Sequence, residues 1–347
     1  MKIICAVFLL CCFIFVPNAR AQKAESDEVI KVKTDLVSVP VVVNDRQGRY
    51  IPNLTQTDFS IFQDGEKQEI SFFAAEEEPL NVAILLDTSK STRNILGEIR
   101  DAAEDFVKLL QPADRAMIVT FDYQVSFLSP LTADHRTLES AISRVDIGEF
   151  GGTVMRDAVA ETINKSFANV KGRKAIILLT DGKDHGSSPT EDELLNNLQE
   201  SDVLIYSVYY DTSRQQNFRG NGGFGGMGGM RRGGGFGRRG DIFGGDFPTR
   251  NPQAERRRER QERVNEAAKN YLSELSQVTA GRFYEGANTN LKKTFAQIAD
   301  ELKKQYRIGF YPKDETAAAD DAVHQIKVKV NRSDVAIRAR STYRLKQ

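Results

Sequence analysis

Uninterrupted apolar runs alternate with stretches of helical periodicity through the middle of the chain, and this alternation constrains the fold more than any other feature. An unbroken apolar run is typical of a parallel strand covered on both faces, and apolar residues three and four positions apart indicate an amphipathic helix. The pattern predicts an α/β fold with a doubly wound, mostly parallel sheet, which binds ligands at the carboxyl ends of its strands. The expected strands are 82–86, 116–121, 124–128, 175–179, 203–208 and 282–284, and the expected helices are 95–110, 138–145, 155–170, 191–200 and 290–302.

The two ends of the chain have a different pattern, with short strands separated by turn residues. Residues 28–78 predict a small antiparallel β module, in which Asp64-Gly65 favours a hairpin and Pro40 favours an edge strand or a bulge. Residues 305–347 contain strands in which apolar and polar residues alternate. We therefore expect both ends to form one β-sandwich, with the central domain, residues 80–304, inserted between them. The alternative is a separate C-terminal hairpin packed on the central domain.

The N-terminus has the pattern of a signal peptide. Lys2 precedes an apolar run at 3–16, which is short for a membrane span, and Ala19-Arg20-Ala21 offers small residues for cleavage after Ala21. An uncleaved signal anchor is the alternative. All 3 cysteines lie in residues 1–21, so the cleaved chain would have no disulfide and no cysteine metal site. We expect an exported protein, periplasmic or extracellular.

Residues 214–263 form a second unusual segment, which holds 14 of the 26 glycines and 12 arginines against five acidic residues. Its glycine-rich part predicts a disordered insertion, whereas residues 254–269 favour a helix. A surface loop is the preferred interpretation. Contact with anionic envelope lipid or polysaccharide is an alternative, and single-stranded RNA is disfavoured by export. Since the whole chain has a formal net charge of zero, no nucleic-acid partner is expected.

Oxygen-bearing side chains follow several of the predicted strands. Asp87, Ser89 and Ser91 follow the strand at 82–86, Asp181 follows the strand at 175–179, and Thr153 precedes a predicted helix. Because the carboxyl ends of parallel strands meet at one edge of the sheet, these side chains are expected to converge there. Two carboxylates and three hydroxyls are hard ligands, which favour Mg²⁺, or Ca²⁺ or Mn²⁺, over zinc or copper.

These residues resemble, in order and spacing, the metal-ion-dependent adhesion site of von Willebrand factor A-type domains. Together with the flanking strands, the chain is also similar to the VWFA-related family described from acidobacteria. The resemblance implies Mg²⁺ held by the five residues, a protein partner that offers an Asp or Glu carboxylate, and Asp157 orienting the Thr153 loop. The Gly/Arg insertion and Lys90 within the metal loop depart from what the resemblance explains.

Enzymatic functions fit the sequence less well. A Mg²⁺-dependent hydrolase would use the same edge of the sheet, but no nucleophilic aspartate is followed two residues later by a second acid. His135, His185 and His324 are dispersed, and His185 is expected in a surface loop. We therefore expect a binding module rather than an enzyme. A hydrolase at the same site, or a structural domain with an idle site, remain the alternatives.

Overall fold

A six-stranded sheet forms the centre of the fold. The computed structural model describes residues 36–75, 78–211, 252–286, 290–312 and 322–344. The strand order is β10-β9-β8-β5-β6-β7, and every pairing is parallel except that of β7 with β6. The predicted doubly wound α/β sheet is therefore confirmed. The strands are β5 Leu80–Asp87, β6 Arg115–Phe121, β7 Val125–Phe127, β8 Arg173–Thr180, β9 Leu204–Tyr209 and β10 Arg282–Glu285.

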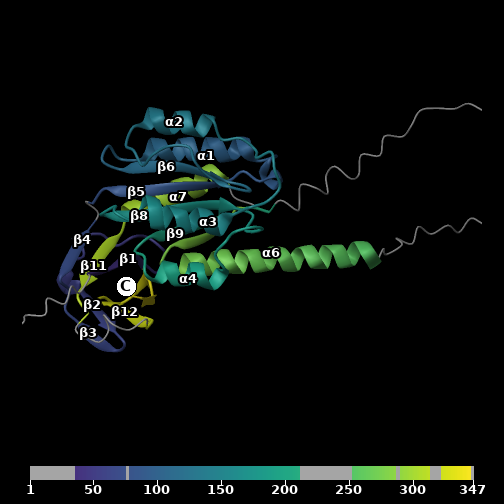
Figure 1. Cartoon of the computed structure of the whole chain (residues 1–347). Helices are drawn as coiled ribbons and strands as arrows, with labels where there is room; N and C mark the ends of the chain where they lie inside the picture. The colour runs from purple at the N-terminus through teal and green to yellow at the C-terminus, as the bar shows by residue number, and fades with distance from the viewer. Residues whose placement is uncertain (1–35, 76–77, 212–251, 287–289, 313–321, 345–347) are drawn as a thin grey trace, which may run out of the picture. The chain divides into compact units, whose positions relative to one another are not determined.

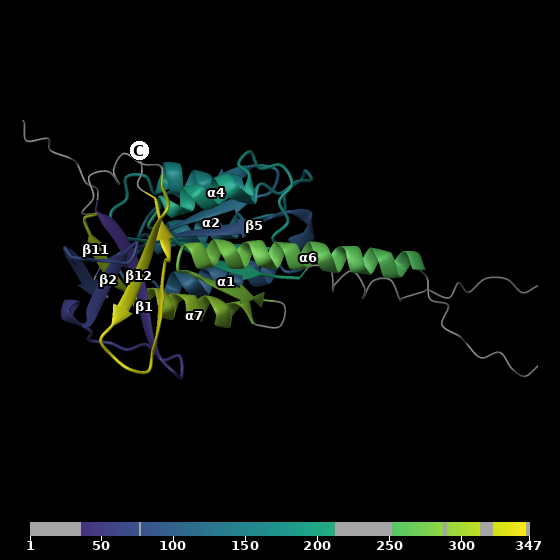
Figure 2. The ribbon, with the colours of Figure 1, turned by 90° about the horizontal axis from the view of Figure 1, so that it is seen from below.

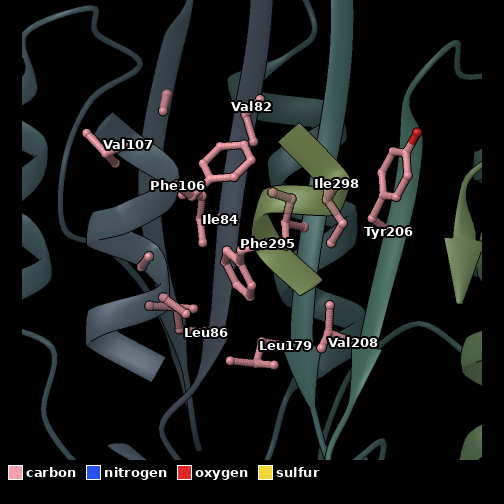
Figure 3. Packing of buried hydrophobic residues seen from close by; sticks show 14 of the residues in the cluster. Val82, Ile84, Leu86, Phe106, Val107, Leu179, Tyr206, Val208, Phe295 and Ile298 are labelled. Carbon is pink, nitrogen blue, oxygen red and sulfur yellow. The ribbon is translucent and has the colours of Figure 1, made fainter. Parts of the chain in front are cut away.

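Helices cover both faces of this sheet (Figures 1 and 2). One core cluster joins α1, α2 and α7 to one face of the sheet, and a second joins α3, α4 and α6 to the other. In the first cluster Phe106 of α1 meets Phe295 of α7 edge to face, with ring centroids 6.1 Å apart (Figure 3). The helices are α1 Leu96–Leu109, α2 His135–Ser143, α3 Met155–Glu161 with a π-helical turn at Thr162–Ser166, α4 Glu191–Gln199, α6 Pro252–Val278 and α7 Leu291–Lys303.

Strands from the two ends of the chain form two further antiparallel sheets. Their orders are β13-β1-β11-β4 and β14-β12-β2-β3, and one apolar core cluster joins the two. Each sheet pairs N-terminal with C-terminal strands, so the predicted shared sandwich is confirmed and the separate C-terminal hairpin is wrong. The strands are β1 Val37–Asp45, β2 Phe59–Gln63, β3 Glu66–Gln68, β4 Phe72–Ala75, β11 Tyr306–Phe310, β12 His324–Val330, β13 Val335–Ala339 and β14 Thr342–Tyr343.

Pro40 lies neither on an edge strand nor at a bulge, contrary to the sequence-based expectation. β1 pairs with β11 from Val37 to Val41 and with β13 from Val41 to Asp45, in unbroken register on each side. Pro40 faces Arg307 of β11 just before the β13 pairing begins. Of the described strands, only β11 lies beside Pro40, because β13 begins to pair at Val41. The missing N–H of Pro40 therefore leaves the hydrogen bonds between β1 and β11 intact. The predicted hairpin is present, since Asp64-Gly65 joins β2 to β3.

The predicted signal peptide and most of the predicted Gly/Arg-rich insertion, residues 1–21 and 214–251, lie outside the described residues. The helix predicted at 254–269 is confirmed and is longer than expected, because α6 runs from Pro252 to Val278. Residues 252–263 of the predicted insertion 214–263 are therefore helical. Arg, Glu and Gln favour the helix locally, and buried Tyr271, Leu272 and Leu275 anchor it. No helix in the described ranges is both long and apolar enough to cross a membrane.

Candidate metal centre

Asp87 and Asp181 lie at the carboxyl edge of two adjacent strands where the strand order reverses. Asp87 ends β5, and Asp181 directly follows β8, which pairs with β5 in parallel. After β5 the chain adds β6 on one side and β8 on the other, so this point is the topological switch of the sheet. Both side chains are buried, with relative exposures of 0% and 2%. The fold therefore brings two carboxylates together at the expected ligand position.

The loop after β5 brings Ser89 and Ser91 to Asp87. The Ser89 backbone N–H donates to Asp87 Oδ1 at 2.9 Å, and the two serine Oγ atoms lie 2.9 Å apart. A short helical turn at Lys90–Thr92 closes the loop, in which the Thr92 hydroxyl donates to the Ser89 carbonyl oxygen at 2.8 Å. Ser89 is buried, whereas Ser91 is exposed. Lys90 is exposed and forms no ion pair with a described residue.

Burial and a neighbouring carboxylate make the ionised form of Asp87 costly. Burial raises the pKa of Asp87 to about 6, and the negative charge of Asp181 contributes to the same rise. Lys183 Nζ pairs with Asp181 Oδ2 at 3.0 Å. No Lys or Arg of the described chain pairs with Asp87, whose Oδ2 accepts instead from the Thr180 hydroxyl at 2.8 Å. The Asp87 carboxylate would be stabilised by any cation that reached it.

Thr153 is fixed by the loop that follows Asp181. Its carbonyl oxygen accepts from the His185 N–H at 2.8 Å, and its own N–H donates to the His185 carbonyl oxygen at 3.5 Å. The Thr153 side chain is buried but has no hydrogen bond to the other four candidate ligands in the described structure. Asp157 accepts from the Ser188 N–H at 3.2 Å and so ties α3 to the same loop. The exposed His185 thus supports Thr153 through its backbone.

Three residues near the site were not identified from the sequence: Thr180, Lys183 and Tyr210. The Tyr210 hydroxyl is buried and has no hydrogen-bond partner with normal geometry. Burial raises its pKa, and the charges of Asp87 and Asp181 add to this rise, which places the hydroxyl near both carboxylates. Tyr210 directly follows β9, so its position at a strand end was a usable signal. The sequence does not single out Tyr210, because this tyrosine continues the apolar pattern of β9.

The donor set fits a hard divalent cation. Carboxylate and hydroxyl oxygens are the ligands that Mg²⁺, Ca²⁺ and Mn²⁺ prefer. No group of three or more His, Cys, Asp or Glu side chains gathers as a metal site in the described ranges. A site of two carboxylates and three hydroxyls lies outside that pattern. A bound ion would balance the charge of buried Asp87, and its water would give the buried Tyr210 hydroxyl a hydrogen-bond partner.

An exposed aromatic pair borders this edge of the sheet. Tyr123 and Phe150 lie edge to face with ring centroids 4.8 Å apart, and they are 42% and 57% exposed. Tyr123 follows Asp122, whose carbonyl oxygen accepts from the Val154 N–H at 2.8 Å. Phe150 is on the loop that leads to Thr153. Exposed aromatic side chains beside a polar site are typical of protein-binding surfaces.

The central part of the chain matches a known family of domains. Residues 81–220 match the family model described as the von Willebrand factor type A domain. This range contains all five candidate ligands, the aromatic pair and Tyr210. No curated protein matches the chain significantly.

Several solved structures resemble the fold at low sequence identity. BatB from Bacteroides thetaiotaomicron is 19% identical, with 65% of this chain and 98% of that chain covered and a TM-score of 0.42. The vWF domain of the pilus tip protein Mfa5 from Porphyromonas gingivalis is 15% identical, with 65% and 95% covered and a TM-score of 0.43. Proximal thread matrix protein 1 from the mussel byssus, in a structure with zinc in its MIDAS motif, is 15% identical, with 70% and 50% covered and a TM-score of 0.47.

Replacing Lys183 with glutamine is expected to strengthen Mg²⁺ binding. The Lys183 ammonium lies on Asp181, so it partly neutralises a candidate ligand and repels an incoming cation. Removing that charge should raise the affinity by about three- to tenfold, which corresponds to about 1 kcal/mol. Calorimetric titration with Mg²⁺ measures the effect, with Lys183→Arg as the charge-preserving control. Weaker binding by Lys183→Gln would show that the lysine organises the site rather than competing for it.

Proposed function

We propose, on the premise that residues 81–220 are a von Willebrand factor type A domain, that the protein is a non-enzymatic binding module. Its domain would hold a divalent cation, Mg²⁺, through Asp87, Ser89, Ser91, Thr153 and Asp181. The bound ion would accept a carboxylate oxygen from an Asp or Glu of a protein partner, and Asp157 would keep the Thr153 loop in place through the 182–188 loop.

The observation that carries this proposal is the buried pair Asp87 and Asp181 with serine hydroxyls beside it. Two carboxylates balance the charge of a divalent ion, and the nearby Lys183 ammonium adds one positive charge. The loaded site would therefore have a net charge of about +1, by simple addition of unit charges. Neutral hydroxyl ligands do not reduce this charge. A single acidic side chain from outside is the complement that such a site attracts.

The aromatic pair supports a protein as the partner. Tyr123 and Phe150 expose apolar surface next to the loops that carry the ligands. A free carboxylate anion would gain nothing from this surface, whereas a folded or extended chain can cover it while its acidic residue reaches the ion. Export to the periplasm or the cell exterior, expected from the N-terminal sequence, would place the module among envelope or secreted partners.

Catalysis at this site has less support. His135 begins α2, His324 lies in the sandwich strand β12, and His185 contributes only backbone bonds to the Thr153 loop. The described site therefore offers no histidine base. A hydrolase would cleave a phosphate-ester substrate with added Mg²⁺ and lose this activity in Asp87→Asn, whereas the binding module would show no turnover in either form.

Partner capture with and without metal tests the proposal. Purified protein immobilised in Mg²⁺ is expected to retain envelope or secreted proteins that EDTA releases and that Asp87→Asn does not retain. Asp146→Asn is the matched control, because Asp146 is exposed on a loop and, among the described residues, accepts only from the adjacent Ile147 N–H. Capture that is identical in Mg²⁺, in EDTA and with Asp87→Asn would rule out metal-mediated binding and leave a domain with an idle site.

A further inference from the structure

The N-terminal part of α6 extends past the carboxyl edge of the sheet (Figures 1 and 2). Contacts along the helix fix its direction, since Thr279 bonds to Ile205 of β9, Ser276 bonds to Ser207, and Lys269 lies over the Tyr209 ring. α6 therefore runs antiparallel to β9, and its earlier residues lie beyond the end of that strand. Every side chain from 255 to 264 is exposed. We call residues 255–264 the overhang.

Just after the overhang, α6 packs against the 182–188 loop that follows Asp181. Gly182, which follows Asp181, has a φ of +72°, and a Cβ added there would lie 2.9 Å from the Ala268 Cβ and 3.1 Å from Leu272 Cδ1. α6 thus packs against this loop one turn after the overhang ends. Tyr271 faces the same side, because Arg156 and Asp184 influence its hydroxyl electrostatically. This side of the helix is the one that looks over the 182–188 loop.

Charges in the overhang are separated around the helix. Arg257 and Arg260 lie 14 and 11 residues before Tyr271, close to four and three helical turns, so they share the side of α6 that carries Tyr271 and looks toward Asp184. Arg256 and Arg263 flank them, and the four arginines form what we call the arginine face. Glu255, Glu259 and Glu262 repeat at positions i, i+4 and i+7 on a side turned away from Asp184.

We propose that the arginine face is a second contact for an acidic protein segment whose first carboxylate is bound at the metal centre. This inference rests on the proposed function and specifies the partner. Arg260 and Arg257 lie eight and eleven residues before Ala268, which is about 12 and 16 Å along the helix axis. An extended chain covers this distance in about four or five residues. The partner is therefore an acidic segment with carboxylates that continue several residues beyond the metal-bound one.

A labelled acidic peptide tests the contact. The probe is a fluorescein-labelled peptide of alternating glutamate and serine, about 12 residues and so about 40 Å when extended, and fluorescence anisotropy reports its binding in Mg²⁺. Arg257→Glu with Arg260→Glu is expected to weaken binding by about tenfold or more and to reduce its salt dependence. Arg136→Glu, at an exposed position of α2 across the sheet from α6, is the matched control and should have a much smaller effect. Calorimetry should give the same Mg²⁺ affinity for all three proteins.

The outcomes separate this inference from the proposed function. Binding that requires Mg²⁺ and Asp87 but is equal in the Arg257/Arg260 and Arg136 variants would overturn the inference and leave the proposed function intact. Peptide binding that depends on the arginine face but is unaffected by EDTA and by Asp87→Asn would contradict both the inference and the proposed function. The peptide would then bind the arginines without any contact to the metal centre. A peptide with glutamine in place of glutamate that binds as tightly as the acidic peptide would also overturn the inference. So would Mg²⁺-independent binding to phosphatidylserine vesicles that is tighter than binding to the acidic peptide.

Discussion

Replacing Asp87 with asparagine is expected to stabilise the metal-free protein at neutral pH while removing its response to Mg²⁺. Burial, with a contribution from Asp181, raises the pKa of Asp87 from 3.8 to about 6 in the folded protein. That rise corresponds to about 3 kcal/mol of destabilisation once the carboxylate is ionised. Asparagine carries no charge and keeps one acceptor for the Ser89 N–H, but it places an amide opposite Thr180. We expect a net gain of about 1–2 kcal/mol, which raises Tm by about 2–5 °C.

The pH dependence of the wild type follows from the same group. Between about pH 4 and 6 the folded metal-free protein holds the Asp87 proton while the unfolded chain has released it. The stability from this group is therefore fully present below pH 3.8 and is lost as the pH rises through about 6. Bound Mg²⁺ reverses the trend, because it needs the ionised carboxylate. At about one hundred times its Kd the metal adds about 2.7 kcal/mol.

Thermal unfolding of Asp87→Asn, Asp146→Asn and the wild type, with EDTA and with Mg²⁺, measures both effects. The expected order in EDTA at neutral pH places Asp87→Asn above the other two proteins, and only those two should gain stability from Mg²⁺. A metal-free Asp87→Asn protein less stable than the wild type would mean that the Thr180 and Ser89 bonds outweigh the buried charge. A Tm of that variant that still rises with Mg²⁺ would place the ion elsewhere.

Replacing Gly281 with alanine is expected to cause the largest loss of stability. Gly281 connects α6 to β10, and a Cβ there would lie 1.8 Å from the Ile205 carbonyl oxygen and 2.6 Å from its carbon. Both atoms belong to the backbone of β9, so no side chain can rotate away. Relief requires β10 to move from β9, where Arg282 pairs with Tyr206. We expect a cost of more than about 3 kcal/mol.

Gly97→Ala provides the control for this change. Gly97 is exposed in α1, and a Cβ there meets no atom within 4 Å. Alanine should therefore stabilise that helix by about 0.5–1 kcal/mol. Denaturant unfolding of both variants measures the difference. A loss below about 1 kcal/mol for Gly281→Ala would indicate that the backbones of β9 and β10 are not as close as described.

The central fold could be predicted from the sequence because burial on both faces leaves an unmistakable pattern. All eight residues of β5 are buried, and residues 82–86 within it form the kind of apolar run that parallel strands require. The shared sandwich was predictable from alternation at the two ends of the chain. The position of Pro40 was not, because a strand that changes partners in mid-course requires knowledge of β11 and β13. The helix expected at 254–269 ended too early. The buried residues that extend α6 to Val278 lie after the charged stretch from which the helix was predicted.

The candidate site was predictable where it depends on residues at strand ends. Asp87, Ser89 and Ser91 are local in sequence, and the structure joins them through short hydrogen bonds. The roles of Lys183 and Tyr210 depend on side-chain directions and on burial, which spacing does not specify. The support of Thr153 by the His185 backbone is a contact between two loops distant in sequence, and no periodic pattern indicates it.

Calorimetric titration of the metal-free protein with Mg²⁺ tests most directly whether Asp87, Ser89, Ser91, Thr153 and Asp181 form one metal site. We expect one ion bound per chain, with binding lost in Asp87→Asn and weakened at least tenfold, about 1.4 kcal/mol, in Thr153→Ala. Thr153 is the informative position, because its side chain has no hydrogen bond to the other four residues in the described structure. An unchanged Mg²⁺ affinity in Thr153→Ala, or no heat of binding in the wild type, would contradict the account.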